Sequence, residues 1–288
     1  MFSVTHLSQE GSLSTTGETS MLVHPTDFTP AGALAFAHAV RLALRGRETL
    51  SLLNIATDDL GPRRNGLRQV ADLLAKWNLL PEKAPPESLK DELGLNVVSV
   101  GMPAADAREG ILEYLDDHPC DIAVLATRDH RGLARWLERS VAKRALRRAK
   151  TMVLMVREGS RGFVDPKTGD FALRRVLVPV DNGNDPSLAL SRLEAWLGQI
   201  GAAPEIRLIY VGSNPPIIGP RPDGVVYSLI ELEGPVAQTI LEEARRWSAD
   251  LIALPTAPSN AMIAAVRGSV GSALLDDASW PLLAVPMS

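Results

Sequence analysis

The 288-residue sequence has little of what stabilises small secreted proteins or builds metal centres. It contains one cysteine, Cys120, so an internal disulfide is excluded. Because Cys120 stands beside an apolar, strand-like run, we expect a small core residue rather than a reactive thiol. All five histidines lie in the first half of the chain, and none has the spacing of a ligand pair with Cys, Asp or Glu. A metal site is therefore not expected.

Long apolar runs and an excess of charge of one sign are also missing. No run approaches the roughly 20 apolar residues of a membrane-spanning helix, and residues 1–20 lack the apolar core and positive leader of a signal peptide. The formal net charge of −4 gives no general attraction to nucleic acid or to an anionic membrane. We therefore expect a soluble, cytoplasmic protein with neither membrane nor nucleic acid as a partner.

Motifs of the common enzyme classes are absent as well. The sequence has no Gly-x-Ser-x-Gly elbow, no phosphate loop ending in Gly-Lys-Ser or Gly-Lys-Thr, and no Gly-x-Gly-x-x-Gly after a strand. Asp27 and Asp181 could act as acid or base in a cleft, but neither has a visible partner. Both are interpreted first as strand-end residues that cap the next turn. No catalytic residue and no enzymatic activity are expected.

What the sequence does contain is a repeat. Residues 121–126, 139–141 and 152–156 return with the same spacing as residues 250–255, 268–270 and 281–285. Each copy is an apolar run, a helical run and a second apolar run, which indicates a strand-helix-strand unit with buried strands. Upstream, residues 22–27 match residues 176–181, and both segments end in Pro-x-Asp. The chain is therefore interpreted as two copies of one α/β domain.

The domain boundaries follow from the repeat and from local composition. The first domain takes residues 1–160, with an N-terminal arm at 1–20, and the second takes residues 174–288. Residues 161–173 are expected to be a linker. They belong to a Gly-rich, charged stretch at residues 157–173, where we expect proteases to cut first. Four prolines in residues 212–224 exclude the second crossover helix from the second domain. Its next strand, at 225–232, is expected to run in a different direction or to lie at an edge.

Strands that alternate with amphipathic helices predict two tandem five-stranded, mainly parallel sheets with helices on both faces. With the strand order 3-2-1-4-5, the winding reverses between strands one and four. Ligands bind at such a reversal, beyond the carboxyl ends of the strands. The rule places Asp27 beside Ala126 in the first copy and Asp181 beside Pro255 in the second.

These features resemble the universal stress protein family. The shared signals are the Pro-x-Asp end of strand one, the apolar second strand, the Asp-Leu-Ile-like fourth strand and the Ser-Val pair before strand five. The resemblance covers both halves apart from residues 1–20 and the linker. It implies a tandem form of the adenine-nucleotide alpha hydrolase-like domain. The two repeats would then pack about a pseudo-twofold axis as an intramolecular pseudo-dimer, and a homodimer of the whole chain stays open.

Members of that family that bind ATP carry a stretch of Gly, two residues, Gly, nine residues, Gly and then Ser or Thr. Glycine lets backbone N–H groups close on phosphates, and the helix N-terminus and hydroxyl add donors. The corresponding residues are Ala126, Asp129, Arg139 and Ser140 in the first copy, and Pro255, Pro258, Gly268 and Ser269 in the second. The resemblance therefore implies a stress-response binding or regulatory protein without the usual ATP site. The alternative is an ATP- or adenine-nucleotide-binding protein with at most slow hydrolysis.

A basic stretch follows the fourth strand of the first copy, where Arg or Lys recurs every four residues from Arg131 to Arg147. This pattern is typical of a solvated helix face, or of an anion site in which guanidinium groups replace missing backbone donors. If a phosphorylated ligand binds, we expect the first half to hold it. The candidate nucleotide- or anion-binding residues are Asp27, Ile55, Ala126, Arg128, Arg131, Arg139, Ser140, Val141, Asp181, Val211, Gly268 and Ser269. No cofactor other than ATP is considered, and the protein partner is unknown.

Overall fold

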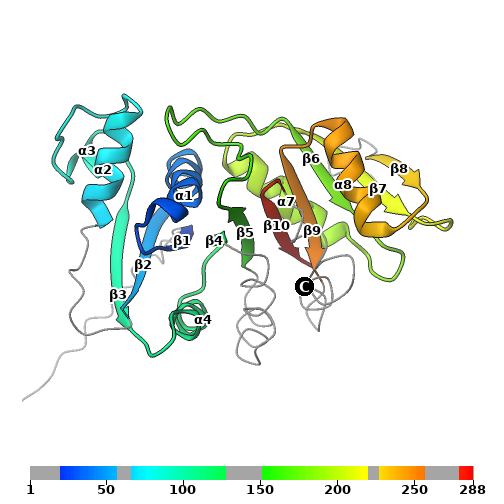
Figure 1. The fold of residues 1–288 in the computed structure, drawn as a ribbon, viewed down its shortest axis with the longest axis horizontal. Coiled ribbons are helices and arrows are strands. Elements are labelled where there is room, and N and C mark those ends of the chain that lie inside the picture. Colours follow the sequence, from blue (N-terminus) through cyan, green and yellow to red (C-terminus); the bar gives the residue numbers. More distant parts are fainter. Residues whose placement is uncertain (1–19, 57–65, 128–150, 220–226, 257–278, 288) are drawn as a thin grey trace, which may run out of the picture.

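The computed structural model describes residues 20–56, 66–127, 151–219, 227–256 and 279–287. Within these residues the strands form one ten-stranded sheet (Figure 1). The strands are β1 (Met21–Pro25), β2 (Thr49–Ala56), β3 (Val97–Pro103), β4 (Ile122–Thr127), β5 (Met152–Arg157), β6 (Arg175–Pro179), β7 (Glu205–Val211), β8 (Ser228–Leu232), β9 (Leu251–Thr256) and β10 (Leu282–Pro286). The helices are η1 (Pro30–Gly32), α1 (Ala33–Gly46), α2 (Gly66–Lys76), α3 (Ser88–Asp91), α4 (Ala107–Asp117), α7 (Ser187–Gln199) and α8 (Val236–Trp247).

The two halves of the sheet have the same strand order. The first half reads β3-β2-β1-β4-β5 and the second, from its own edge, β8-β7-β6-β9-β10, with all neighbours in each half parallel. The predicted order 3-2-1-4-5 is therefore confirmed in the first half and recurs in the second. Of the two alternatives for the strand after the proline loop, the edge position is right, since β8 lies at the sheet edge and runs parallel to β7. The helices expected at 133–149 and 262–276 lie outside the described residues.

The two predicted five-stranded sheets are present, and they are joined edge to edge into one. β5 and β10 pair antiparallel, with Leu154 opposite Leu283. Both strands are apolar and buried on both faces, as is typical of the interior of a covered parallel sheet. Left unpaired, each would expose a row of backbone N–H and C=O groups at an apolar edge. Their pairing satisfies these groups and makes the two edges into the centre of the molecule.

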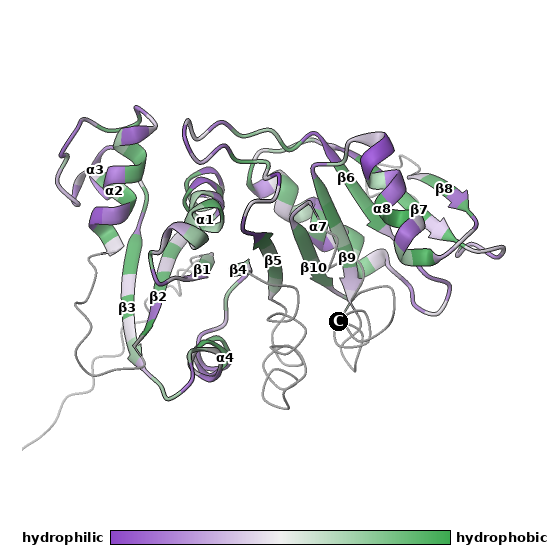
Figure 2. Cartoon of the chain, in the orientation of Figure 1, coloured by the Kyte–Doolittle hydropathy of each residue, from purple (hydrophilic) through white to green (hydrophobic). Residues whose placement is uncertain are grey.

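Helices cover both faces of this sheet. On one face, α1, α2 and α7 lie over a core that continues across the junction, from Leu22 through Leu154 and Leu283 to Val176. On the other face, α4 packs over Val23 and its neighbours, and α8 packs over the second half. Figure 2 shows the central strands mostly in the green of apolar residues, while the helices carry both colours. Alternate residues of each strand thus supply the two cores.

The connection between the halves, residues 158–174, is packed against α1. Phe163 and Val164 are 2% and 1% exposed, and Val164 forms an antiparallel bridge with Phe171. His38 on α1 is fully buried beneath them, and its Nε2 accepts hydrogen bonds from the N–H groups of Phe163 (3.1 Å) and Val164 (3.3 Å). These buried contacts predict that the segment resists proteolysis, contrary to the expectation from its composition.

Trp77, which follows α2, holds the far end of the same connection. Its indole N–H donates to the Pro166 carbonyl at 3.3 Å. Gly169 has a φ of 74°, and a Cβ at this position would lie 2.5 Å from the Trp77 ring. Only glycine tolerates both the left-handed backbone and the close approach. The segment therefore packs in a defined position against the first half.

Candidate functional site

The crevice predicted in the first half lies where β1 and β4 run parallel. Leu22 pairs with Ile122 in this register, which brings the chain after β1 to the end of β4. A Cβ at Gly32 would lie 4.0 Å from both the Ala126 Cβ and the Asp27 Oδ1. The structure therefore brings Asp27, Ala126 and the start of α1 together. The parallel pairing of β6 with β9 carries Asp181 to the equivalent strand end in the second half.

Both strand-end aspartates are engaged in turns. Asp27 Oδ1 accepts hydrogen bonds from the Thr29 N–H (2.9 Å) and the Thr29 hydroxyl (2.7 Å). Asp181 Oδ1 accepts from the Gly183 N–H (2.7 Å) and the Asn184 side-chain amide (3.3 Å). A carboxylate that accepts from the backbone two residues later closes a short turn. These contacts support the turn-capping interpretation that the sequence favoured.

The Asp181 turn gives a direct test of this role. Replacing Asp181 with alanine should lower the free energy of unfolding by about 1 kcal/mol, because the Gly183 N–H loses its acceptor. Replacing it with asparagine should change stability little, since the amide oxygen accepts the same bond. Urea denaturation of the two variants measures the difference. An equal loss in both would mean that the negative charge matters at this position, which a turn role does not require.

Phe28 is a residue of this crevice that sequence reasoning missed. Its φ is 54°, a left-handed conformation that is uncommon for a bulky side chain. The ring meets Phe36 edge-on at a centroid distance of 5.9 Å, and a Cβ at Gly66 would lie 3.3 Å from it. Packing between α1 and the start of α2 thus holds the turn in a strained conformation. The sequence signal that could have identified Phe28 is an aromatic residue directly after Pro-x-Asp, a turn position where small residues are favoured.

His24 connects the two strands that border the crevice. Its Nδ1–H donates to the Val124 carbonyl of β4 at 2.7 Å, and its buried Nε2 has no hydrogen-bond partner among the described residues. Burial lowers the pKa of His24 from 6.5 to about 4. The ring is therefore neutral near pH 7 and supplies no positive charge to a ligand.

Ile55 and Val211 contribute to packing. Ile55 is half-buried and packs with Leu53 and Tyr114 on the α4 face of the sheet, and Val211 packs with Ile209 on the α8 face. The remaining candidates lie outside the described residues, namely Arg128, Arg131, Arg139, Ser140, Val141, Gly268 and Ser269. The structure therefore describes the strand ends and the start of α1, but not the basic stretch.

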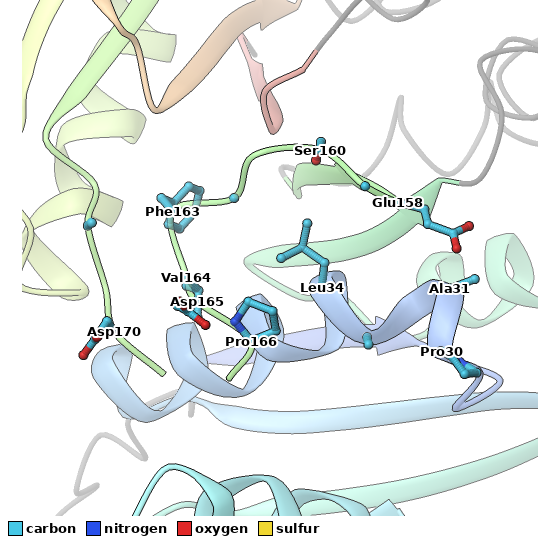
Figure 3. Close-up of a pocket in the computed structure, with 14 residues that line it drawn as sticks. Pro30, Ala31, Leu34, Glu158, Ser160, Phe163, Val164, Asp165, Pro166 and Asp170 are labelled. Carbon is cyan, nitrogen blue, oxygen red and sulfur yellow. The ribbon is translucent and has the colours of Figure 1, made fainter. Parts of the chain in front are cut away.

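A cavity of about 610 Å³ opens between the start of α1 and the connection between the halves (Figure 3). Its wall is apolar at positions such as Leu34 and Phe163, and its charged lining residues are Glu158, Asp165 and Asp170. Figure 3 shows Glu158 across from the first residues of the helix. Among the described lining residues, three are carboxylates and none is basic, so their charge repels a phosphate group. This cavity is not suited to a triphosphate.

The described residues offer neither a metal site, a reactive thiol nor a membrane span. No three His, Cys, Asp or Glu side chains among them are grouped as metal ligands. Burial raises the pKa of Cys120 to about 12, so its thiol stays protonated and unreactive. None of the described helices has the length and apolar character needed to cross a bilayer.

Comparison with solved structures agrees with this architecture. A universal stress protein from Archaeoglobus fulgidus DSM 4304 has 16% sequence identity and a TM-score of 0.60, and the match covers 94% of this chain and 100% of that chain. A putative universal stress protein from Pseudomonas aeruginosa UCBPP-PA14 has 18% identity and a TM-score of 0.55, and the match covers 93% and 92% of the two chains. At these identities the likeness shows the fold.

The family itself is shown by the sequence. No curated protein matches the chain. The model of the universal stress protein family, however, matches residues 21–157 and 219–286, which together make up more than half of the sequence. The first segment contains the ends of β1 and β4, and the second contains β9 and β10, while β6 and β7 lie between the two segments. This chain therefore belongs to the universal stress protein family.

Proposed function

We propose that this chain is a cytoplasmic binding or regulatory protein of the stress response that does not hold ATP in the family's usual way. Membership of the family supports the stress role. The observation that carries the second part is the charge beside the first crevice, where the described residues that line the cavity are acidic and include no basic side chain. The protein acts by binding rather than by catalysis, because Asp27 and Asp181 both close turns.

The end of β9 supports the same proposal for the second half. Pro255 stands at the first glycine position of the ATP-binding pattern and has no backbone N–H to donate. The hydroxyl of the next residue, Thr256, already donates to the Val285 carbonyl at 3.1 Å. If each lost phosphate contact costs roughly 1–3 kcal/mol, two or three losses weaken ATP binding by several orders of magnitude.

The second candidate function is binding of ATP or another adenine nucleotide with at most slow hydrolysis. The feature that favours it is the basic stretch, since Arg128 directly follows Thr127 at the end of β4. Arginine forms charge-assisted bonds to phosphate that are roughly twice as strong as neutral ones. Arg131 and Arg139 would then replace the missing backbone donors around Ser140.

Native mass spectrometry distinguishes the two candidates. Protein purified without added nucleotide should show the mass of the chain alone, and a co-purifying adenine nucleotide would reverse the ranking. If ATP does bind, an Arg131→Ala, Arg139→Ala double variant should weaken it about 100-fold at low salt, because two charge-assisted contacts are removed. Calorimetry with ATP measures this, and the Gly268→Ala, Ser269→Ala variant is the matched control. Binding that is lost only in the control would place the site in the second half.

We further propose that the two repeats form an intramolecular pseudo-dimer. The antiparallel pairing of β5 with β10 supports this, since it lets each repeat cover the other's edge strand. Arg45 at the end of α1 adds a polar contact, donating to the carbonyls of Ile200 and Gly201 after α7, both at 2.8 Å. A homodimer of the whole chain or an external protein partner would use a further surface.

A further inference from the structure

A buried acidic side chain lies where the two halves meet, away from the crevices. Glu48 stands between α1 and β2 and is 2% exposed. Gln199 at the end of α7 belongs to the other half, and its Nε2 donates to Glu48 Oε1 at 2.8 Å. The same amide also donates to the Ser20 hydroxyl at 3.0 Å. Glu48 is therefore part of the contact between the repeats.

A second acidic group lies close to Glu48. The Ser20 hydroxyl donates to Asp121 Oδ2 at 2.7 Å and also lies 3.2 Å from Glu48 Oε1. The Met21 N–H donates to the same Asp121 oxygen at 3.1 Å. One serine thus connects the two carboxyl groups, of which Asp121 is exposed and Glu48 is buried.

No cation compensates Glu48 within the described part of the chain. Arg45 on α1 is directed to the Ile200 and Gly201 carbonyls, and Arg47 is exposed. Cys120 and Asp121 face Glu48 from the segment before β4, and α7 contributes only the neutral Gln199. Glu48 Oε2 is buried without a hydrogen-bond partner among the described residues. An ionised carboxylate in this place would be both poorly solvated and repelled by Asp121.

We propose that Glu48 is a proton-operated latch between the two repeats, which holds the end of α7 when its carboxyl group is neutral and releases it on ionisation. The neutral carboxyl keeps the Gln199 bond without placing a charge in this buried position beside Asp121. Once ionised, the carboxylate is stabilised by water, which reaches it when the end of α7 moves away. The contact between the repeats then becomes sensitive to pH near neutrality.

The direction of the effect follows from the pKa of the group. Burial, and to a smaller extent Asp121, raises the pKa of Glu48 from 4.5 to about 7, against the opposing hydrogen bonds from Ser20 and Gln199. A group whose folded pKa is raised stabilises the closed form fully below about 4.5, and this contribution is lost as the pH rises through 7. Opening at this contact should therefore increase about tenfold between pH 6 and pH 8.

Hydrogen exchange of the whole chain tests the latch. In the wild type, amide protection at residues 196–202 should fall about tenfold between pH 6 and pH 8 after correction for the intrinsic exchange rate. Glu48→Gln keeps the acceptor for Gln199 but cannot ionise, so its protection should be the same at both pH values. Glu82→Gln removes an exposed acid and should respond to pH as the wild type does. Asp121→Asn should move the transition to lower pH, because a like charge is removed.

Three results would overturn the latch. The first is an equal pH response in the wild type and in Glu48→Gln. The second is flat protection at residues 196–202 in the wild type between pH 6 and pH 8, and this measurement decides the question even where Glu48→Gln does not fold. The third is faster exchange over the whole chain, rather than at residues 196–202, since the latch acts at one contact.

Discussion

Lowering the pH from 6.5 to 4 should destabilise this protein, because two buried histidines must take up protons on unfolding. His24 and His38 are both fully buried. Burial lowers the pKa of each from 6.5 to about 4. Between these values the unfolded chain binds more protons than the folded one. The contribution of the two histidines to the free energy of unfolding is therefore fully present above about pH 6.5 and is lost as the pH falls towards 4.

The expected size of this loss is about 3 kcal/mol for each histidine. Glu48 opposes it, since its raised pKa stabilises the folded chain as the pH falls from 7 to 4.5. The net loss in the wild type should then be about 3 kcal/mol. In a Glu48→Gln background, where the opposing group is absent, the loss should approach about 6 kcal/mol.

His38 can be tested separately because both of its nitrogens have defined partners. Its Nδ1–H donates to the Leu34 carbonyl at 2.8 Å, which leaves Nε2 to accept from the connection between the halves. In His38→Gln the side-chain oxygen can accept the same N–H groups without titrating. The acid-induced loss should then fall by about half in the Glu48→Gln background.

Urea denaturation at several pH values between 4 and 7 gives the free energies needed for this comparison. His118→Gln is the matched control, since it makes the same exchange of side chains at an exposed position. An unchanged pH dependence in His38→Gln would show that His38 is not among the groups responsible.

The strand order of each half could be predicted because it is a local property of the sequence. Each apolar run predicts a strand by itself. The repeat of residues 121–156 at residues 250–285 indicates that the two halves have the same strand order. The rule for crevices at a reversal of winding then brought Asp27 to Ala126. None of these steps needed contacts between the halves.

The junction could not be predicted, because it depends on which edges of two finished domains meet. The sequences of β5 and β10 predict buried strands with a neighbour on each side. They do not indicate whether the strand on the second side belongs to the same half of the chain or to the other half. The cluster around Glu48 has the same origin. Ser20, Glu48 and Asp121 are far apart in the sequence of the first half, and Gln199 reaches them from the second half.

The buried contacts of the connection between the halves could not be predicted for a different reason. A stretch of Gly and charged residues predicts a mobile linker, and residues 158–174 contain only a few apolar side chains with no period. Two of these, Phe163 and Val164, are nevertheless buried against α1. A short segment can be anchored by one or two residues, and periodicity does not detect this.

Phe163→Ala should lower the free energy of unfolding by about 3–5 kcal/mol, the cost of truncating a fully buried phenylalanine. The ring meets His38 edge-on at a centroid distance of 4.5 Å and Phe171 at 5.7 Å. Its loss would leave a cavity over α1 and weaken the hydrogen bonds to His38 Nε2. The variant should also be cut by proteases within residues 158–174 first, while the wild type resists cleavage there.

Lys167→Ala is the control, since Lys167 is exposed in the same segment, and its backbone N–H, which donates to Asp165 Oδ1, is kept in the variant. Its stability should stay within about 0.5 kcal/mol of the wild type. A mobile linker would give a different result, with Phe163→Ala as mild as Lys167→Ala and cleavage at residues 158–174 already in the wild type. The two variants therefore decide whether the connection is part of the folded core or only a tether between the repeats.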